Sequence, residues 1–184
     1  MNAWSPKGTV YGTLLNFRRE WDLWAPRMTQ DPHKAPPKAP VLYVKSANTF
    51  APAGQDLLLQ DSVQEVDIGA TLGLVIGAHA QLVGAALLLD WNVPHSSYYR
   101  PPVKFRCRDG FLGLPAQPSA CAPDARWDDV RIEGEFMTLQ PGDVLMVGTD
   151  CLPDGTRPRA RVGDTVELSA PGLLPVRTHV KGLA

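Results

Sequence analysis

Short apolar runs separated by turn residues recur along the chain, and this pattern predicts a β-rich protein rather than a helical bundle. The strongest run, Val-Asp-Ile-Gly-Ala-Thr-Leu-Gly-Leu-Val-Ile-Gly at residues 66–77, predicts a long strand. Residues 81–90 are almost continuously apolar, so a buried strand and a buried helical turn both remain open there. Further strands are expected at residues 8–17, 41–45, 57–59, 144–148 and 165–169.

One segment shows helical spacing instead. Trp21, Trp24 and Met28 recur at positions that share one face of a helix, which predicts a short helix over residues 18–30. Pro26 lies inside this segment and is expected to break or kink it, because proline lacks the backbone N–H that a helix interior needs.

The composition agrees with many short elements joined by turns. The 184 residues include 16 glycines and 18 prolines, which are spread along the chain without a period. A chain of this length buries enough apolar surface to fold without disulfides. We therefore predict a single domain over residues 1–184, of mixed, β-rich α+β class.

Charge and cysteine content narrow the functional classes. Eighteen basic and nineteen acidic residues leave a net charge of −1 with no basic block, which argues against nucleic-acid or anionic-membrane binding. The three cysteines show no spacing typical of a zinc site or a disulfide framework. No signal-peptide layout and no membrane-length apolar run is present, so a cytoplasmic location is expected.

Several short motifs follow one another along the chain. They are Lys7-Gly-Thr-Val, Leu15-Asn-Phe-Arg, Lys34-Ala-Pro-Pro-Lys, Lys45-Ser-Ala-Asn-Thr, Tyr99-Arg-Pro-Pro-Val-Lys-Phe-Arg-Cys-Arg-Asp-Gly-Phe, Glu135-Phe-Met-Thr-Leu-Gln-Pro-Gly-Asp and Gly148-Thr. In this order they resemble the fumarylacetoacetate hydrolase family, over residues 7–111 and, more loosely, 135–170. The likeness is strongest to the amino-terminal half of its bifunctional isomerase/decarboxylases of 4-hydroxyphenylacetate breakdown.

The resemblance implies a β-roll or barrel-like fold with few short helices, and chemistry on small 2-oxo di- and tricarboxylates assisted by Mg²⁺ or Mn²⁺. Members of the family hold this cation with a Glu-x-Glu pair and an aspartate. Here Gly69 and Thr71 stand at the positions of the pair, and only Asp90 matches a metal ligand. A nearby acidic pair, Glu65 and Asp67, lies about 13 Å away along an extended strand. These two residues either contact a metal ion or are solvated residues at the start of the strand.

The resemblance also points to candidate acid–base and substrate-binding residues. Glu20 stands where some members carry a catalytic histidine, and Leu23 stands where those members carry a glutamate. Glu20 is therefore a candidate general base, with a solvated helix-face carboxylate as the alternative. Motif position also makes Lys45 and Arg100 candidates for binding a substrate carboxylate.

Basic residues alternate in Val-Lys-Phe-Arg-Cys-Arg-Asp-Gly-Phe at 103–111, which predicts a strand with Lys104, Arg106 and Arg108 on one face. Arg106 stands where members of the family carry a site lysine, so it is a candidate catalytic residue, and Lys104 is a candidate substrate-binding residue. Guanidinium groups bind carboxylates in a bidentate manner, so this face is suited to a dicarboxylate. The alternative is a solvated basic face.

The Pro-rich stretch 113–134 is shorter than the family's corresponding segment by about twenty residues, judged from mean strand and helix lengths. A shortened roll leaves apolar surface for a partner to cover. We therefore expect a homo-oligomer, or a hetero-oligomer with a carboxyl-terminal-type subunit of the family.

Three functions remain open from the sequence. The first is an isomerase/decarboxylase subunit that works with such a partner. The second is a non-catalytic partner or scaffold subunit that has lost the metal site. The third is a self-sufficient acyl-pyruvate hydrolase, which would need the missing carboxylates.

Overall fold

The computed structural model describes residues 3–38, 41–95, 103–120 and 138–183. The helices are α1 (Arg18–Trp24) and α2 (Val103–Arg106), with 3-10 turns η1 (Ala25–Arg27), η2 (Ala47–Thr49) and η3 (Ala78–Ala80). The strands are β1 (Val10–Leu14), β2 (Val41–Lys45), β3 (Phe50–Ala51), β4 (Leu57–Leu59), β5 (Val66–Ile76), β6 (Leu82–Asn92), β7 (Leu112–Gly113), β8 (Ser119–Ala120), β9 (Val144–Met146), β10 (Arg159–Ala160), β11 (Thr165–Leu168) and β12 (Val176–Gly182).

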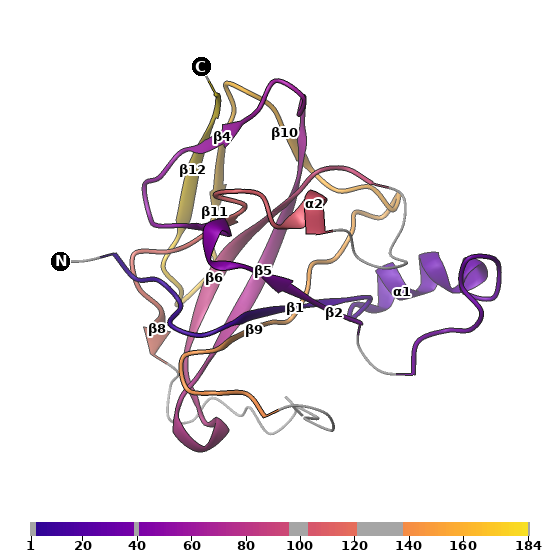
Figure 1. The fold of residues 1–184 in the computed structure, drawn as a ribbon, viewed down its shortest axis with the longest axis horizontal. Coiled ribbons are helices and arrows are strands. Elements are labelled where there is room, and N and C mark those ends of the chain that lie inside the picture. The colour runs from indigo at the N-terminus through magenta and orange to yellow at the C-terminus, as the bar shows by residue number, and fades with distance from the viewer. Residues whose placement is uncertain (1–2, 39–40, 96–102, 121–137, 184) are drawn as a thin grey trace.

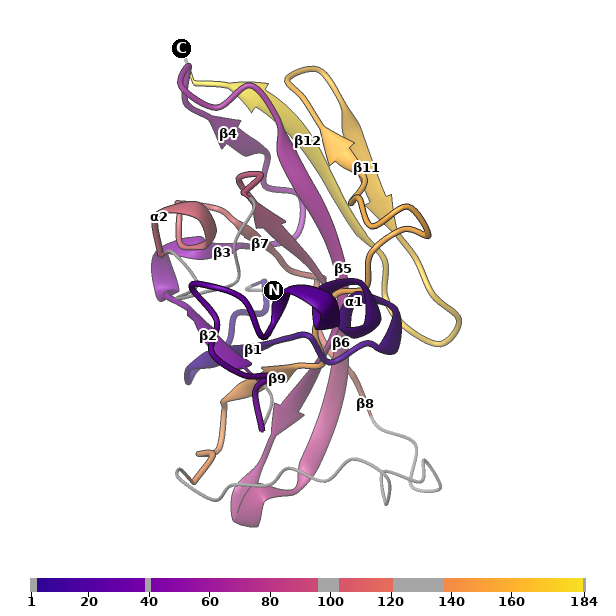
Figure 2. The same cartoon turned by 90° about the vertical axis from the view of Figure 1, so that its right-hand side faces the viewer.

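Within the described residues these strands form two sheets. The larger has nine strands in the order β2-β1-β9-β5-β6-β7-β3, with β10 beside β5 and β8 beside β6, and the smaller has the order β11-β12-β4. The larger sheet is curled, so that β1, β2 and β9 run across the direction of the long β5–β6 hairpin in both views (Figure 1, Figure 2). This architecture confirms the predicted β-rich roll with few short helices.

The β5–β6 hairpin separates two apolar clusters. Leu87, Leu89 and Trp91 of β6 pack with residues of β4 and β12 from the smaller sheet. The alternating side chains point the other way, where Leu88 packs with residues of β1, β2 and β9 inside the curled sheet. Strand β6 is buried on both faces, which explains why its sequence is an almost continuous apolar run. Of the two alternatives at residues 81–90, a buried strand and a buried helical turn, the strand is therefore correct. Asp90 shares the face of Leu88 and is placed inside the curl.

The strands predicted at residues 8–17, 41–45, 57–59, 66–77, 144–148 and 165–169 are present, with differences at their ends. The predicted helix at residues 18–30 is α1 followed by η1, in which Pro26 lies. Strand β12 was not predicted, although Val176, Thr178 and Val180 alternate with exposed residues. Of the stretch predicted to be irregular at 113–134, residues 113–120 contribute to β7 and β8, and the rest lies outside the described residues.

The predicted strand at 103–111 is wrong, because residues 103–106 form helix α2. The backbone N–H of Cys107 donates to the carbonyl of Val103 at 2.8 Å, which closes a helical turn. Two prolines precede this segment in the sequence, and proline favours the first turn of a helix. The helix also separates the basic residues, since Arg106 is buried and Lys104 is exposed.

Gly12 of β1 gives the Tyr43 ring its place inside the curl. The two residues are direct cross-strand partners in the antiparallel β1–β2 pair. A Cβ atom at position 12 would overlap the Tyr43 ring, so the ring lies flat on the glycine backbone. This packing matters for the site because the Tyr43 hydroxyl donates to Asp90.

We predict that Gly12→Ala lowers the free energy of unfolding by about 1–3 kcal/mol, the usual cost of overpacking a core. Gly182→Ala is the matched control, because a Cβ there meets only ordinary contacts, at 3.9 Å from Val162. Urea denaturation of both variants measures the difference. Equal stabilities for the two variants would show that Tyr43 does not need the space above Gly12.

Candidate functional site

The candidate site lies on the inner face of the β5–β6 hairpin. The antiparallel register places Gly69 opposite Asp90 and Asp67 opposite Asn92. Because side chains alternate across a strand, Thr71 shares this face as well. The face combines polar groups of two long strands with the apolar cluster inside the curl, so the charges here are shielded from water.

Asp90 is the centre of the site and contacts three side chains from other elements. Its carboxylate lies 2.6 Å from the Lys45 ammonium, and its second oxygen lies 3.6 Å from the Arg106 guanidinium. The Tyr43 hydroxyl donates a hydrogen bond to that second oxygen. The Arg106 guanidinium also lies over the Tyr43 ring, 4.5 Å from its centroid, in cation–π geometry. Strand β2 and helix α2 thus converge on one buried carboxylate.

The ionisation of this cluster follows from burial and from its opposite charges. Burial raises the pKa of Asp90, but Lys45 and Arg106 outweigh it and hold the pKa below its ordinary value. Burial lowers the pKa of Lys45, and Asp90 only partly offsets this effect. Burial and the Asp90 charge raise the pKa of Tyr43 well above its ordinary value, so its phenol remains a hydrogen-bond donor.

Lys45 is held by the backbone as well as by Asp90. Its ammonium donates to the carbonyls of Trp91 at 3.0 Å, Arg106 at 2.8 Å and Phe111 at 2.8 Å. These three carbonyls match the three N–H donors of an ammonium group. If Lys45 binds a substrate carboxylate as predicted, it therefore does so through its charge, because it has no spare hydrogen-bond donor.

Three buried polar atoms around Asp90 have no hydrogen-bond partner within the described part of the chain. They are Thr71 Oγ1, Asn92 Oδ1 and Arg106 Nε. A buried polar atom left without a partner costs about 1–3 kcal/mol, so such atoms mark places where a polar ligand or ordered water binds. The donor at Arg106 is suited to a carboxylate oxygen, because a guanidinium–carboxylate hydrogen bond is charge-assisted.

Glu20 is buried, so its expected alternative role as a solvated helix-face carboxylate is wrong. It forms an ion pair with Arg157, and it accepts a hydrogen bond from the backbone N–H of Leu15 at 3.2 Å. Arg157 also donates to the hydroxyl of Thr149 and to the carbonyl of Asp150, the latter at 3.0 Å. The pair joins helix α1 to the segment 149–157. Sequence reasoning missed Arg157, which no motif marks.

The described residues do not fit a divalent cation at Asp90. Mg²⁺ and Mn²⁺ prefer several oxygen ligands, carboxylates above all, whereas Asp90 already faces an ammonium and a guanidinium. At position 69 a Cβ atom would lie 2.8 Å from the Thr149 methyl and 2.7 Å from the carbonyl oxygen of Asp90, so the space that a glutamate would need is filled. Among the described residues no group of three metal-binding side chains occurs.

Glu65 and Asp67 pair with arginines, so neither sequence alternative describes them. Glu65 contacts Arg159 and lies 3.0 Å from Arg161, while Asp67 lies 3.1 Å from Arg159. Strand β10 brings these arginines beside the start of β5, through the pairing of Arg159 with Asp67. The acidic pair stabilises an edge of the sheet and is already neutralised.

The other candidates lie apart from Asp90 or outside the described residues. Arg100 falls in the segment 96–102, which the structure does not describe. Lys104 is exposed, with its ammonium 4.9 Å from the centroid of the Phe105 ring. Of the basic residues at 103–111, Arg106 alone contacts Asp90 in the described structure.

We predict that Lys45→Met lowers the free energy of unfolding by about 3–5 kcal/mol, because it leaves the buried Asp90 charge without its nearest partner. Lys181→Met is the matched control: it removes an exposed lysine that pairs with Asp56 at 2.5 Å, and should cost less than about 1 kcal/mol. Chemical denaturation measures both. A loss at Lys45 no larger than at Lys181 would contradict a central role for the ion pair.

We also predict that the chain binds Mg²⁺ and Mn²⁺ no more tightly than about 1 mM, since one neutralised carboxylate is a poor site for a hard cation. Isothermal titration of the wild-type chain and of Asp90→Asn tests this. Tighter binding that disappears in Asp90→Asn would show a working metal site.

In the described residues no helix is long and apolar enough to span a membrane. Two solved structures show how far this fold is shared. A 5-carboxymethyl-2-hydroxymuconate delta-isomerase from Mycobacterium smegmatis aligns with a TM-score of 0.66 and 16% identity, over 99% of this chain and 82% of that protein. A maleylpyruvate hydrolase from Sphingobium sp. SYK-6, in complex with manganese (II) ion and pyruvate, aligns with a TM-score of 0.63 and 16% identity, over 95% of this chain and 70% of the hydrolase.

The sequence comparisons agree with the structural ones. A 4-hydroxyphenylacetate degradation bifunctional isomerase/decarboxylase from Escherichia coli is 31% identical over 211 residues, which include 95% of this chain and 47% of that enzyme. The chain therefore spans about half the length of this relative. The sequence profile of the fumarylacetoacetate (FAA) hydrolase C-terminal family matches residues 9–135 and 128–181. These matches extend over most of the chain, which belongs to the fumarylacetoacetate hydrolase family.

Proposed function

We propose that the chain is a subunit of an isomerase/decarboxylase that acts on small 2-oxo di- and tricarboxylates from 4-hydroxyphenylacetate breakdown. In this proposal it works with a carboxyl-terminal-type subunit of the same family. Support comes from the named relatives, of which this chain spans about half the length.

The observation that carries the proposal is the buried Arg106 beside Asp90. Its side chain is 5% exposed, and its Nε has no hydrogen-bond partner within the described residues. Thr71 Oγ1 and Asn92 Oδ1 are likewise unpartnered there, on the same sheet face as Asp90. A carboxylate on Arg106 would satisfy the orphaned donor and place a 2-oxo acid against the hairpin.

Two positive charges at this place also favour the chemistry of 2-oxo acids. Loss of CO₂ or migration of a double bond in such an acid passes through an enolate, and fixed cations lower the energy of that developing charge. Arg106 and Lys45 are held in place by Asp90, Tyr43 and backbone carbonyls, so they need not reorganise during the reaction. Glu20 is the candidate base, and its pairing with Arg157 keeps it in place in the first turn of α1.

One observation favours a second candidate, a non-catalytic subunit of the same enzyme. Asp90 is already neutralised by Lys45 and Arg106, and Gly69 and Thr71 supply no carboxylate. In this alternative the chain shapes or stabilises the complex, and its partner alone supplies the reacting groups.

We predict that the isolated chain shows little Mg²⁺- or Mn²⁺-dependent decarboxylation of oxaloacetate, a simple 2-oxo dicarboxylate, above the rate with metal alone. Activity is expected when the carboxyl-terminal half of the Escherichia coli relative is added. In that mixture Arg106→Gln should lower kcat/KM by about 10- to 100-fold, the value of one charge-assisted hydrogen bond, and Arg106→Lys should restore most of it.

The control for this prediction is Arg18→Gln on α1. The Arg18 side chain is 86% exposed, in contrast to the buried side chain of Arg106. Unchanged activity of the mixture with Arg106→Gln would favour the non-catalytic subunit. Robust metal-dependent turnover by the isolated chain would contradict both candidates.

A further inference from the structure

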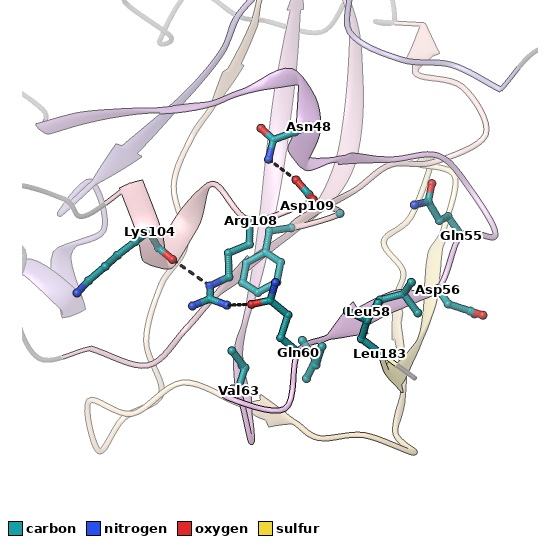
Figure 3. A pocket seen from close by; sticks show the side chains of 13 residues that line it. Asn48, Gln55, Asp56, Leu58, Gln60, Val63, Lys104, Arg108, Asp109 and Leu183 are labelled. Atoms are coloured by element: carbon teal, nitrogen blue, oxygen red, sulfur yellow. Dashed lines mark hydrogen bonds between the residues drawn. The ribbon is translucent and has the colours of Figure 1, made fainter.

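A pocket of about 540 Å³ opens on the side of the molecule where the end of α2, the strand β4 and the end of β12 meet (Figure 3). A volume of this size is in the range of small-molecule sites. None of the residues that surround Asp90, namely Tyr43, Lys45, Thr71, Asn92 and Arg106, lines this pocket. The pocket is therefore separate from the candidate site.

The apolar part of the pocket comes from Leu58, Leu59, Val63, Phe111 and Leu183. Leu59 and Phe111 are buried, whereas Leu58 and Leu183 are 49% and 50% exposed. Leu58 and Leu183 are thus half exposed beside two buried apolar residues. A ligand with an apolar body would cover them and remove their apolar surface from water.

The polar part of the pocket is dominated by Arg108. Its Nε donates to the carbonyl of Lys104 at 3.0 Å and its Nη1 donates to the amide oxygen of Gln60 at 3.2 Å. Figure 3 shows the guanidinium between these two groups, while the Lys104 side chain runs away from it. Both acceptors are neutral, and no carboxylate in the described residues forms an ion pair with Arg108, so its charge is not compensated by the fold.

The two carboxylates that line the pocket each have a donor already. Asp109 accepts a hydrogen bond from the Asn48 amide at 2.7 Å, and Asp56 lies 2.5 Å from the Lys181 ammonium. Asp56 is thereby neutralised, whereas the Asn48 amide is neutral and leaves Asp109 its charge. Lys104 and Arg108 also line the pocket, and these two cations outweigh that one carboxylate, so a ligand meets a net positive charge.

We propose that this pocket binds a small carboxylate with an apolar body, such as an aryl or short alkyl acid. The ligand carboxylate binds the guanidinium of Arg108, and the apolar body covers Leu58 and Leu183. A carboxylate supplies the missing negative charge in the bidentate geometry that arginine favours. This inference does not rest on the proposed function, because it uses no residue of the Asp90 cluster.

The test uses phenylacetate as the probe and phenylacetamide as its uncharged counterpart, titrated into the isotope-labelled full chain and followed by NMR. We expect saturable shifts at amides of the pocket, such as Leu58, Gln60 and Gly110, and binding of phenylacetamide at least about tenfold weaker, equivalent to about 1.4 kcal/mol. Arg108→Gln should weaken phenylacetate binding by a similar factor, whereas Arg18→Gln on α1 should leave it unchanged.

A second variant keeps the test decisive if Arg108→Gln disturbs the fold. Leu58→Asp alters an exposed position and should abolish phenylacetate binding by placing a negative charge beside the ligand. The proposal is overturned if no saturable shift occurs, if the shifts fall on the hairpin around Asp90 instead, or if the amide binds as tightly as the acid. It is also overturned if a folded Leu58→Asp variant binds phenylacetate like wild type.

Discussion

The compensation of one buried carboxylate, Asp90, shapes the structure around it. An isolated charge inside a protein is strongly unfavourable, so the aspartate needs positive partners brought in from elsewhere in the chain. Lys45 comes from β2 and Arg106 from α2, and both reach an aspartate on β6. Tyr43 adds a hydrogen bond, made possible by the glycine under its ring. The edge strand, the helix and the central hairpin are thereby connected at a single point inside the curled sheet.

The same compensation determines what chemistry the site can offer. A carboxylate facing open space is a ligand for a hard cation, whereas a carboxylate paired with an ammonium and a guanidinium has its charge already neutralised. The charge available to a ligand is then positive. The Arg106 Nε, which has no hydrogen-bond partner in the described part of the chain, offers a donor to an anion as well. The face is therefore better suited to an anion than to a metal ion, which is the reverse of what three acidic ligands would provide.

Much of the fold and the centre of the site could be predicted from the sequence, because strands and motif residues are local signals. The pairing of Glu20 with Arg157 could not, since it joins residues 137 positions apart and no motif marks the arginine. For the same reason the sequence did not reveal the arginines that neutralise Glu65 and Asp67, because they lie more than ninety positions further along the chain. Tyr43 could have been found, because it precedes Lys45 by two positions on a strand and so shares its face.

The difference between a strand and a helix at residues 103–106 explains why the chain has two separate anion-binding candidates. On a strand, Lys104, Arg106 and Arg108 would share one face. On a helix, successive residues turn by about 100°, so Lys104 and Arg106, two positions apart in α2, point to nearly opposite sides. Arg106 accordingly faces Asp90, while Arg108, which follows the helix, donates to the carbonyl of Lys104. One basic segment thus supplies a buried cation to the hairpin and a half-exposed cation to the pocket. Phe111 connects the two places, because it lines the pocket and its carbonyl accepts a hydrogen bond from the Lys45 ammonium.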